Sequence, residues 1–224
     1  MSDVKLLAST VAVLRDGGNG IETLMLRKNS RIAFGGMWVF PGGRIDPEDY
    51  QHSHTTKNDE LSVARVAAAR EAKEEAAIEL APQSLIHFSH WLPPAQAKKR
   101  FSTWFFVAKA GEEQIQIDDG EIVEYEWMCP GDALAKCDTG EIELAPPTWV
   151  SLHTFQDFAT AEELMISLSK RTPSHYETRM TRGEEGFVAL WSGDAGYDTS
   201  DAKVPGARHR LERQKQGYRF YKHP

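Results

Sequence analysis

Two stretches of the sequence decide the fold and the chemistry that we expect. The first reads WVFPGGRID at residues 38–46, and the second reads AREAKEEAAI at residues 69–78. The second belongs to an alanine-rich run, which favours helix strongly, and Pro82 stops it. We therefore predict a glycine-rich turn followed, after a loop, by a helix over residues 61–80.

The predicted helix places glutamates on one face. Residues three or four positions apart are neighbours on a helix, so Glu71 lies beside Glu74 and Glu75. Each like-charge pair costs about 0.2–0.5 kcal/mol on an isolated helix, and Arg70 offsets only part of this through Glu74. Hard oxygen ligands suit Mg²⁺ or Mn²⁺. If the helix were considered by itself, its acidic face could simply be exposed to solvent. The predicted glycine-rich turn before it indicates instead a metal site that holds a diphosphate.

This combination resembles the Nudix box, in which Gly, five residues, Glu and seven residues precede Arg-Glu-apolar-x-Glu-Glu-x-Gly-apolar. Gly43 matches the opening glycine, and Asp49 stands where the first glutamate belongs. The second half matches at Arg70, Glu71, Ala72, Glu74, Glu75 and Ile78. There are two departures. About thirteen extra residues lengthen the loop before the helix, which costs little entropy. Ala77 replaces a glycine, which is harmless if this residue is helical but not if it needs a positive φ.

The resemblance implies an α/β fold, a Nudix-type α/β/α sandwich with a mixed β-sheet, and metal-dependent diphosphatase activity. Glu71 and Glu75, one helical turn apart, are the candidate direct ligands of Mg²⁺ or Mn²⁺, and Glu74 is a third ligand or a base. By family analogy the backbone carbonyl near Gly43 also binds the metal. Arg70 would orient a carboxylate through a charge-assisted hydrogen bond. We therefore assign catalytic roles to Arg70, Glu71 and Glu74.

The general base is a separate question, because Nudix enzymes use either a glutamate of the box or one from a loop. Residues 118–127 offer Glu121, Glu124 and Glu126, and strand alternation puts Glu124 and Glu126 on the same side. Glu121 and Glu124 look like the acidic pair that often precedes a tryptophan in this family. We select Glu124, although a solvated strand edge explains each of the three equally well.

Several further segments resemble the peroxisomal coenzyme A diphosphatase branch of the family. They are residues 24–30, 91–94, 99–106, 145–148 and 191–197. The resemblance predicts cleavage of coenzyme A or acyl-coenzyme A to 3′,5′-ADP and (acyl-)4′-phosphopantetheine. The predicted substrate-binding side chains are four cations suited to phosphates and one aromatic ring suited to adenine: Arg27, Lys28, Arg31, Arg100 and Phe34. Surface cations and ordinary packing are the alternative readings of these residues.

Two other functions stay open. Pro93 lies fifteen residues after Ile78, a spacing seen in ADP-ribose hydrolases of this family, so an ADP-ribose or other NDP-sugar pyrophosphatase is the second reading. A non-catalytic nucleotide-binding regulator with the same fold is the third. The retained Glu71, Glu74 and Glu75 count against the regulator.

Composition limits the class of protein. The 224 residues suit one Nudix domain over 1–224, with a core at about 5–145 and a helical, basic extension at about 146–224.

The formal charge of −7 argues against nucleic-acid binding, so we expect a small nucleotide diphosphate substrate. No apolar run reaches membrane-spanning length. Cys129 and Cys137 fit reduced thiols, which favours a cytoplasmic protein. The resemblance also allows a homodimer.

A coarse reading of hydrophobic patterns gives the remaining elements. We predict strands at residues 10–15, 23–27, 84–90, 101–108, 122–128 and 187–191. Residues 148–182 are predicted to be helical in two pieces broken near Pro173. Residues 203–224 carry seven Lys or Arg and one acid, and their aromatic ending indicates a packed segment.

Overall fold

The computed structural model describes residues 5–31, 34–53, 59–97, 99–112, 114–118 and 120–223. In these residues the main sheet has the strand order β3-β2-β1-β6-β5-β8, with β4 paired to β1 and β7 paired to β2. Its strands are β1 (Lys5–Gly17), β2 (Gly20–Lys28), β3 (Trp38–Val39), β4 (Gly42–Arg44), β5 (Ile86–Leu92), β6 (Arg100–Lys109), β7 (Ile122–Met128) and β8 (Ser174–Glu177). β1 pairs with β6, and β5 with β8, in parallel, whereas the other pairs are antiparallel. The sheet is therefore mixed, as predicted.

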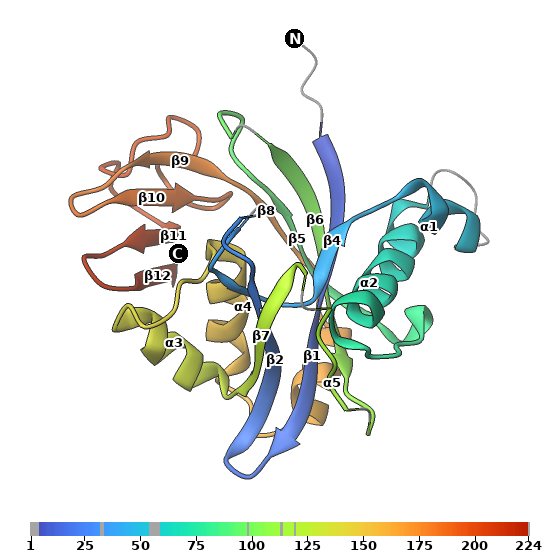
Figure 1. The fold of residues 1–224 in the computed structure, drawn as a ribbon. Coiled ribbons are helices and arrows are strands. Elements are labelled where there is room, and N and C mark those ends of the chain that lie inside the picture. The colour runs from blue at the N-terminus through green and yellow to red at the C-terminus, as the bar shows by residue number, and fades with distance from the viewer. Residues whose placement is uncertain are drawn as a thin grey trace.

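Helices cover both faces of this sheet (Figure 1). α2 (Glu60–Ala76) packs against one face, with α1 (Pro47–His52) beside it and the 3₁₀ turn η1 (Pro82–Ser84) after it. α3 (Pro130–Asp138), α4 (Pro146–Phe155) and α5 (Ala161–Ser169) pack against the other face. The predicted α/β/α sandwich is confirmed. No helix in the described ranges is both long and apolar enough to span a membrane.

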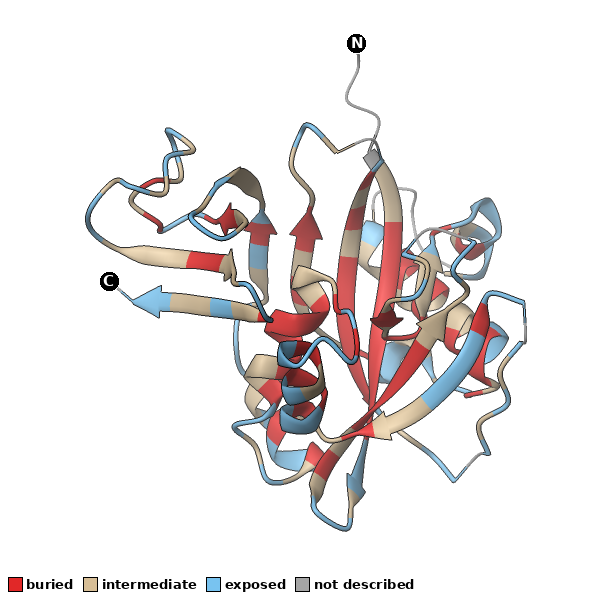
Figure 2. Ribbon diagram, turned by 60° about the vertical axis from the view of Figure 1, so that its left-hand side comes forward, coloured by how far each residue is buried: buried red, intermediate tan, exposed pale blue. Residues whose placement is uncertain are grey.

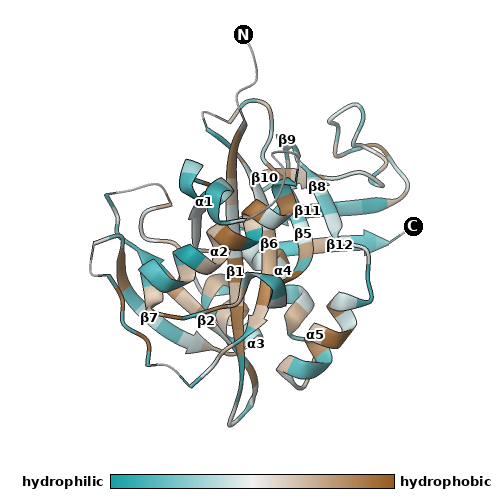
Figure 3. Ribbon diagram, turned by 90° about the vertical axis from the view of Figure 1, so that its right-hand side faces the viewer, coloured by the Kyte–Doolittle hydropathy of each residue, from teal (hydrophilic) through white to brown (hydrophobic). Residues whose placement is uncertain are grey.

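Strand β1 lies in the interior of the sheet and is buried on both of its faces. Residues 8–14 are all buried, and Figure 2 shows the strands at the middle of the sheet as largely buried. Val11 and Val13 pack toward α2, while Ala12 and Leu14 pack toward the opposite helices. A strand covered by helices on both sides needs a nearly continuous apolar run. Figure 3 shows this strand as strongly hydrophobic.

The helix that carries the glutamates begins and ends with defined caps. The Asp59 side chain accepts from the backbone N–H of Ser62 at 3.1 Å. At the other end Ala77 has φ 57° and ψ 28°, and the N–H of Ile78 donates to the Ala72 carbonyl at 3.2 Å. The N–H of Ala77 also donates to the Lys73 carbonyl at 3.0 Å, the bond of the αL type of helix ending. Helix α2 therefore stops at Ala76, before the predicted residue 80, and Ala77 occupies a left-handed position rather than a helical one.

The prediction for the C-terminal third is only partly right. Residues 148–182 do contain two helices, α4 and α5, but the break between them lies at residues 156–160 rather than near Pro173. The piece predicted after Pro173 is not helical, because residues 174–182 form strands β8 and β9 (Arg179–Arg182). Tyr176 of β8 stacks on Trp91 of β5, with ring centroids 3.9 Å apart. This pairing joins segments more than eighty residues apart, so local helix propensity could not reveal it.

The rest of the extension forms a second sheet rather than more helix. It contains β9, β10 (Phe187–Leu190), β11 (Arg208–Arg213) and β12 (Tyr218–His223), in the order β12-β11-β10-β9. Arg210 donates twice to the Asp194 carboxylate at 2.7 Å, and Asp194 is 6% exposed. Tyr218 and Phe220 pack against the main core, so the aromatic ending is packed as expected.

We expect Ala77→Gly to stabilise the protein by about 0.5–1 kcal/mol. A left-handed conformation costs an L-residue roughly 1–2 kcal/mol, and the greater freedom of glycine in the unfolded chain cancels part of that gain. Urea unfolding would measure the change. The matched control is Ala76→Gly, one residue earlier inside the helix, which should destabilise by about 0.5–1 kcal/mol. Equal effects of the two substitutions would contradict a strained Ala77.

Candidate active site

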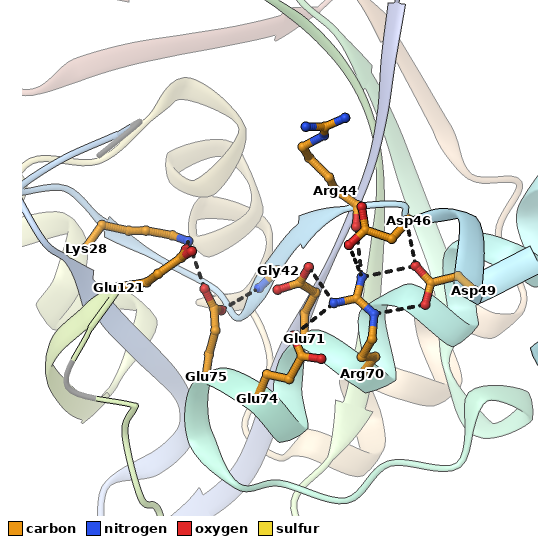
Figure 4. A network of polar contacts seen from close by, with 10 residues as sticks. All are labelled: Lys28, Gly42, Arg44, Asp46, Asp49, Arg70, Glu71, Glu74, Glu75 and Glu121. Carbon is orange, nitrogen blue, oxygen red and sulfur yellow. Dashed lines mark hydrogen bonds and ion pairs between the residues drawn. The ribbon is translucent and has the colours of Figure 1, made fainter. Parts of the chain in front are cut away.

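Arg70 of helix α2 contacts helix α1 and strand β4 (Figure 4). The two glycines that we predicted to form a turn, Gly42 and Gly43, belong to β4 and pair with β1. Its Nε and one terminal nitrogen donate to the two oxygens of Asp49 at 2.9 and 3.0 Å. Its other terminal nitrogen donates to Glu71 and Glu74, both at 3.0 Å. It also donates to the carbonyl of Arg44 at 3.0 Å. A planar guanidinium suits this forked arrangement. Arg70 therefore orients carboxylates, in the geometry that the sequence suggests.

Glu75 lies at the end of the cluster nearest to strand β2. Its side chain is 5% exposed, and Lys28 Nζ is 2.8 Å from its Oε1. The N–H of Gly42 donates to its Oε2 at 2.9 Å. Burial raises the pKa of Glu75, while Lys28 and the Gly42 N–H oppose the shift. Both oxygens of Glu75 are thus engaged by groups of the chain itself.

Glu71 sits directly over the second glycine of β4. A Cβ atom added to Gly43 would meet the Glu71 carboxylate, so a larger residue at this position would require that side chain to move. Burial raises the pKa of Glu71 to about 7; Glu75 and Glu74 add to the shift, and Arg70 opposes it. The helix therefore holds a carboxylate whose charge is poorly compensated, next to the Gly43 backbone.

The same residues fit a divalent cation. Carboxylate and carbonyl oxygens are the ligands that Mg²⁺ and Mn²⁺ prefer, and Glu71, Glu75 and Gly43 bring them together. Glu74 is more open, with its side chain 58% exposed. Among the described residues, no three carboxylate, imidazole or thiol groups already form a metal site. Glu75 is held by Lys28, and Glu74 by Arg70, which accounts for this.

The structure separates the candidate bases. Glu121 Oε2 lies 3.4 Å from Lys28 Nζ, so Glu121 reaches the cluster. Glu124 pairs with Arg27 at 2.7 Å. Arg27 shares a face of β2 with Met25, which packs toward α3, α4 and α5, whereas Lys28 points toward α2. Glu124, our predicted base, and Arg27, a predicted substrate ligand, therefore lie on the face of the sheet opposite to the carboxylates of α2.

The remaining predicted substrate ligands, Arg31, Phe34 and Arg100, differ in exposure. Arg31 is exposed in the loop after β2. Phe34 is 51% exposed, and its ring centroid is 6.5 Å from that of Phe101. Arg100 is 7% exposed, and its Nε donates to the Pro93 carbonyl at 3.1 Å, so it is not a surface cation. Lys28 is the predicted ligand that the fold brings to the carboxylates.

Sequence reasoning missed two contributions to this cluster. The N–H of Gly42 fixes Glu75, a contact of the backbone that side-chain patterns do not show. Arg44 follows the glycines, and its exposed guanidinium points away from the cluster in Figure 4. The sequence signal that could have identified Arg44 is a cation directly after the glycine pair. Arg44 stands at the edge of the acidic site, where an anionic ligand would approach.

We expect Glu71→Gln to stabilise the metal-free protein at pH 8, by on the order of 1–3 kcal/mol. The folded-state pKa of Glu71 is raised from 4.5 to about 7. Its contribution to stability is therefore present below pH 4.5 and is lost as the pH rises toward 7. Urea unfolding in chelator at pH 8 and pH 5.5 should show the advantage shrinking at the lower pH. Glu74→Gln, at a more exposed position, should change stability little at either pH, and equal shifts for both variants would refute this assignment.

Comparison with known proteins agrees with the motif. The NUDIX domain family model matches residues 5–148. Acyl-coenzyme A diphosphatase NUDT19 of Xenopus laevis is 28% identical over 122 residues. The match covers 51% of this chain and 32% of that protein, so the chain corresponds to about a third of the length of this relative.

Solved structures show the same fold. A NUDIX hydrolase from Alicyclobacillus acidocaldarius is 24% identical, with a TM-score of 0.65, over 77% of this chain and 100% of that one. The NUDIX domain of Shewanella oneidensis NrtR, solved with ADP ribose, is 16% identical, with a TM-score of 0.51, over 69% of this chain and 88% of that one. Because the family model matches more than half of the chain, this protein belongs to the NUDIX domain family.

Proposed function

We propose that this protein hydrolyses the diphosphate of coenzyme A or acyl-coenzyme A, using Mg²⁺ or Mn²⁺. The observation that carries the chemistry is the convergence of Glu71, Glu75 and Glu121 beside the Gly42 and Gly43 backbone. The choice of substrate is supported by the relative named acyl-coenzyme A diphosphatase and by the segments that resemble that branch. The products would be 3′,5′-ADP and (acyl-)4′-phosphopantetheine.

The residues of the cluster have different proposed roles. Glu71, Glu75 and the carbonyl near Gly43 would hold the metal, with Glu74 as an additional ligand. A bound divalent cation neutralises phosphate charge and acidifies a coordinated water. Arg70 is a positioning residue, because it holds Asp49, Glu71 and Glu74 in place. Arg44, exposed directly after the two glycines, would contact substrate phosphates, and Arg31 stays a candidate for the same role.

Glu121 is our proposed general base, in place of Glu124. A base must come within hydrogen-bond reach of the water whose proton it takes, directly or through one more water. Glu121 lies at the mouth of the site with its side chain 63% exposed, and it contacts the same lysine as Glu75. It can therefore move toward a water held between the metal ligands and the substrate.

The first experiment is a product assay with purified protein and Mg²⁺ or Mn²⁺. Coenzyme A, acetyl-coenzyme A, ADP-ribose, NADH and a dinucleoside polyphosphate would be incubated separately and the products read by mass. We expect 3′,5′-ADP from the coenzyme A substrates, and loss of most turnover in Glu75→Gln. Glu79→Gln is the matched control, since Glu79 pairs with Lys73 beyond the site. AMP from ADP-ribose alone would identify the second candidate instead. No turnover of any substrate would leave a nucleotide-binding regulator.

A second experiment separates the two candidate bases. We expect Glu121→Gln to lower kcat by about 10²–10⁴-fold, the usual contribution of a general base. Glu124→Gln should stay within a few-fold of the wild type, because Glu124 faces the other side of the sheet. The pair is well matched, since both glutamates are exposed and lie three residues apart. The reverse order of the two effects would restore Glu124 as the base.

A further inference from the structure

Lys28 lies at the end of the carboxylate cluster nearest to strand β2. It stands at the end of β2, and its side chain is 11% exposed. Its Nζ lies 2.8 Å from Glu75 Oε1 and 3.4 Å from Glu121 Oε2. It thus bridges the proposed metal ligand and the proposed base, as Figure 4 shows. An ammonium group held between two carboxylates stands where a cation is favoured.

The charge balance of the cluster makes Lys28 an internal counter-ion. Two cations, Arg70 and Lys28, contact six carboxylates: Asp46, Asp49, Glu71, Glu74, Glu75 and Glu121. The guanidinium of Arg70 is fixed by the buried Asp49, which is 1% exposed. Burial works against the charged form of Lys28, but Glu75 and Glu121 outweigh it, so its pKa lies above the ordinary value. Lys28 is therefore charged at neutral pH.

Coordination of a metal by Glu75 conflicts with this arrangement. Its Oε2 accepts from Gly42, and its Oε1 is the oxygen that Lys28 contacts. A divalent cation bound at Oε1 and the ammonium of Lys28 beside it would repel each other, because both are positive and close together. Lysine carries its charge on a flexible four-carbon stem, so its ammonium can swing away, unlike the forked Arg70.

We infer that Lys28 holds the metal position in the metal-free protein and leaves Glu75 when a divalent cation binds, so that its ammonium then faces the substrate phosphates. The inference rests on the proposed function, because it takes Glu75 as a metal ligand. It gives Lys28 two opposite effects: it weakens metal binding and strengthens substrate binding. A purely structural ion pair would do neither.

The first test is the affinity for Mn²⁺ without substrate, measured by isothermal titration calorimetry. Lys28→Met removes the charge and keeps most of the side-chain length. Losing a close charge competitor should tighten Mn²⁺ binding about tenfold or more. The matched control is Lys73→Met, which removes one charge from the same region, since Lys73 pairs with Glu79 in solvent. It should change the affinity by less than about twofold. An unchanged or weaker affinity in Lys28→Met overturns the inference.

The second test uses the wild-type protein, so it does not depend on the folding of a variant. Trace acetylation followed by peptide mass spectrometry reports how accessible each lysine is. Saturating Mg²⁺ should raise the labelling of Lys28 several-fold relative to Lys136, which pairs with Glu126 outside the site. Unchanged or reduced labelling of Lys28 would count against its release.

Steady-state kinetics tests the second half of the inference. Lys28→Met should reach half-maximal rate at a lower Mg²⁺ concentration and yet show a raised KM for the substrate. A fall in kcat alone would refute the contact with substrate phosphates. If the wild type binds no divalent cation, the proposed function and this inference fail together. If it binds the metal but Lys28→Met binds it no tighter, only this inference fails.

Discussion

The guanidinium of Arg70 is the constraint on which the site depends. It connects helix α2 to α1 through Asp49 and to strand β4 through the Arg44 carbonyl. Asp49 is almost fully buried, so an unpaired charge there would be strongly destabilising. Because one planar group makes these contacts, the rotation of α2 about its axis is fixed. That rotation places Glu71 over Gly43 and Glu75 beside Gly42.

Small side chains let the helix come this close to the strands. The alanines of α2 that face the sheet are fully buried: Ala64, Ala67, Ala68, Ala72 and Ala76. On the other side of the contact, a Cβ atom at Gly42 would collide with Ser9 and Thr10 of β1, and one at Gly43 would meet the Glu71 carboxylate. The close approach desolvates Glu71 and raises its pKa, so the geometry useful for binding a cation is unfavourable for the metal-free fold. Loss of stability at functional sites is common in natural proteins.

The departures from the Nudix pattern lie where the fold tolerates them. The insertion lies between Asp49 and Arg70, and the contacts of Arg70 with Asp49 are intact. Ala77 lies beyond the last helical residue, where its strain is local. The C-terminal extension is attached to the core through aromatic contacts rather than through the site. Trp91, Tyr176 and Trp191 form this junction, with ring centroids 3.9–5.5 Å apart.

The sequence by itself determined helix α2 and the spacing of Glu71, Glu74 and Glu75, because these depend on local propensity and helical periodicity. Tertiary structure decided the rest, because strand pairing joins distant segments. A bulge in the β2–β7 pairing shifts the register beside Lys28. Ile122 rather than Val123 is therefore paired with Lys28, and Glu121 comes to the site while Glu124 does not. The Lys28–Glu75 pair and the second sheet also needed contacts across the fold, which no local pattern encodes.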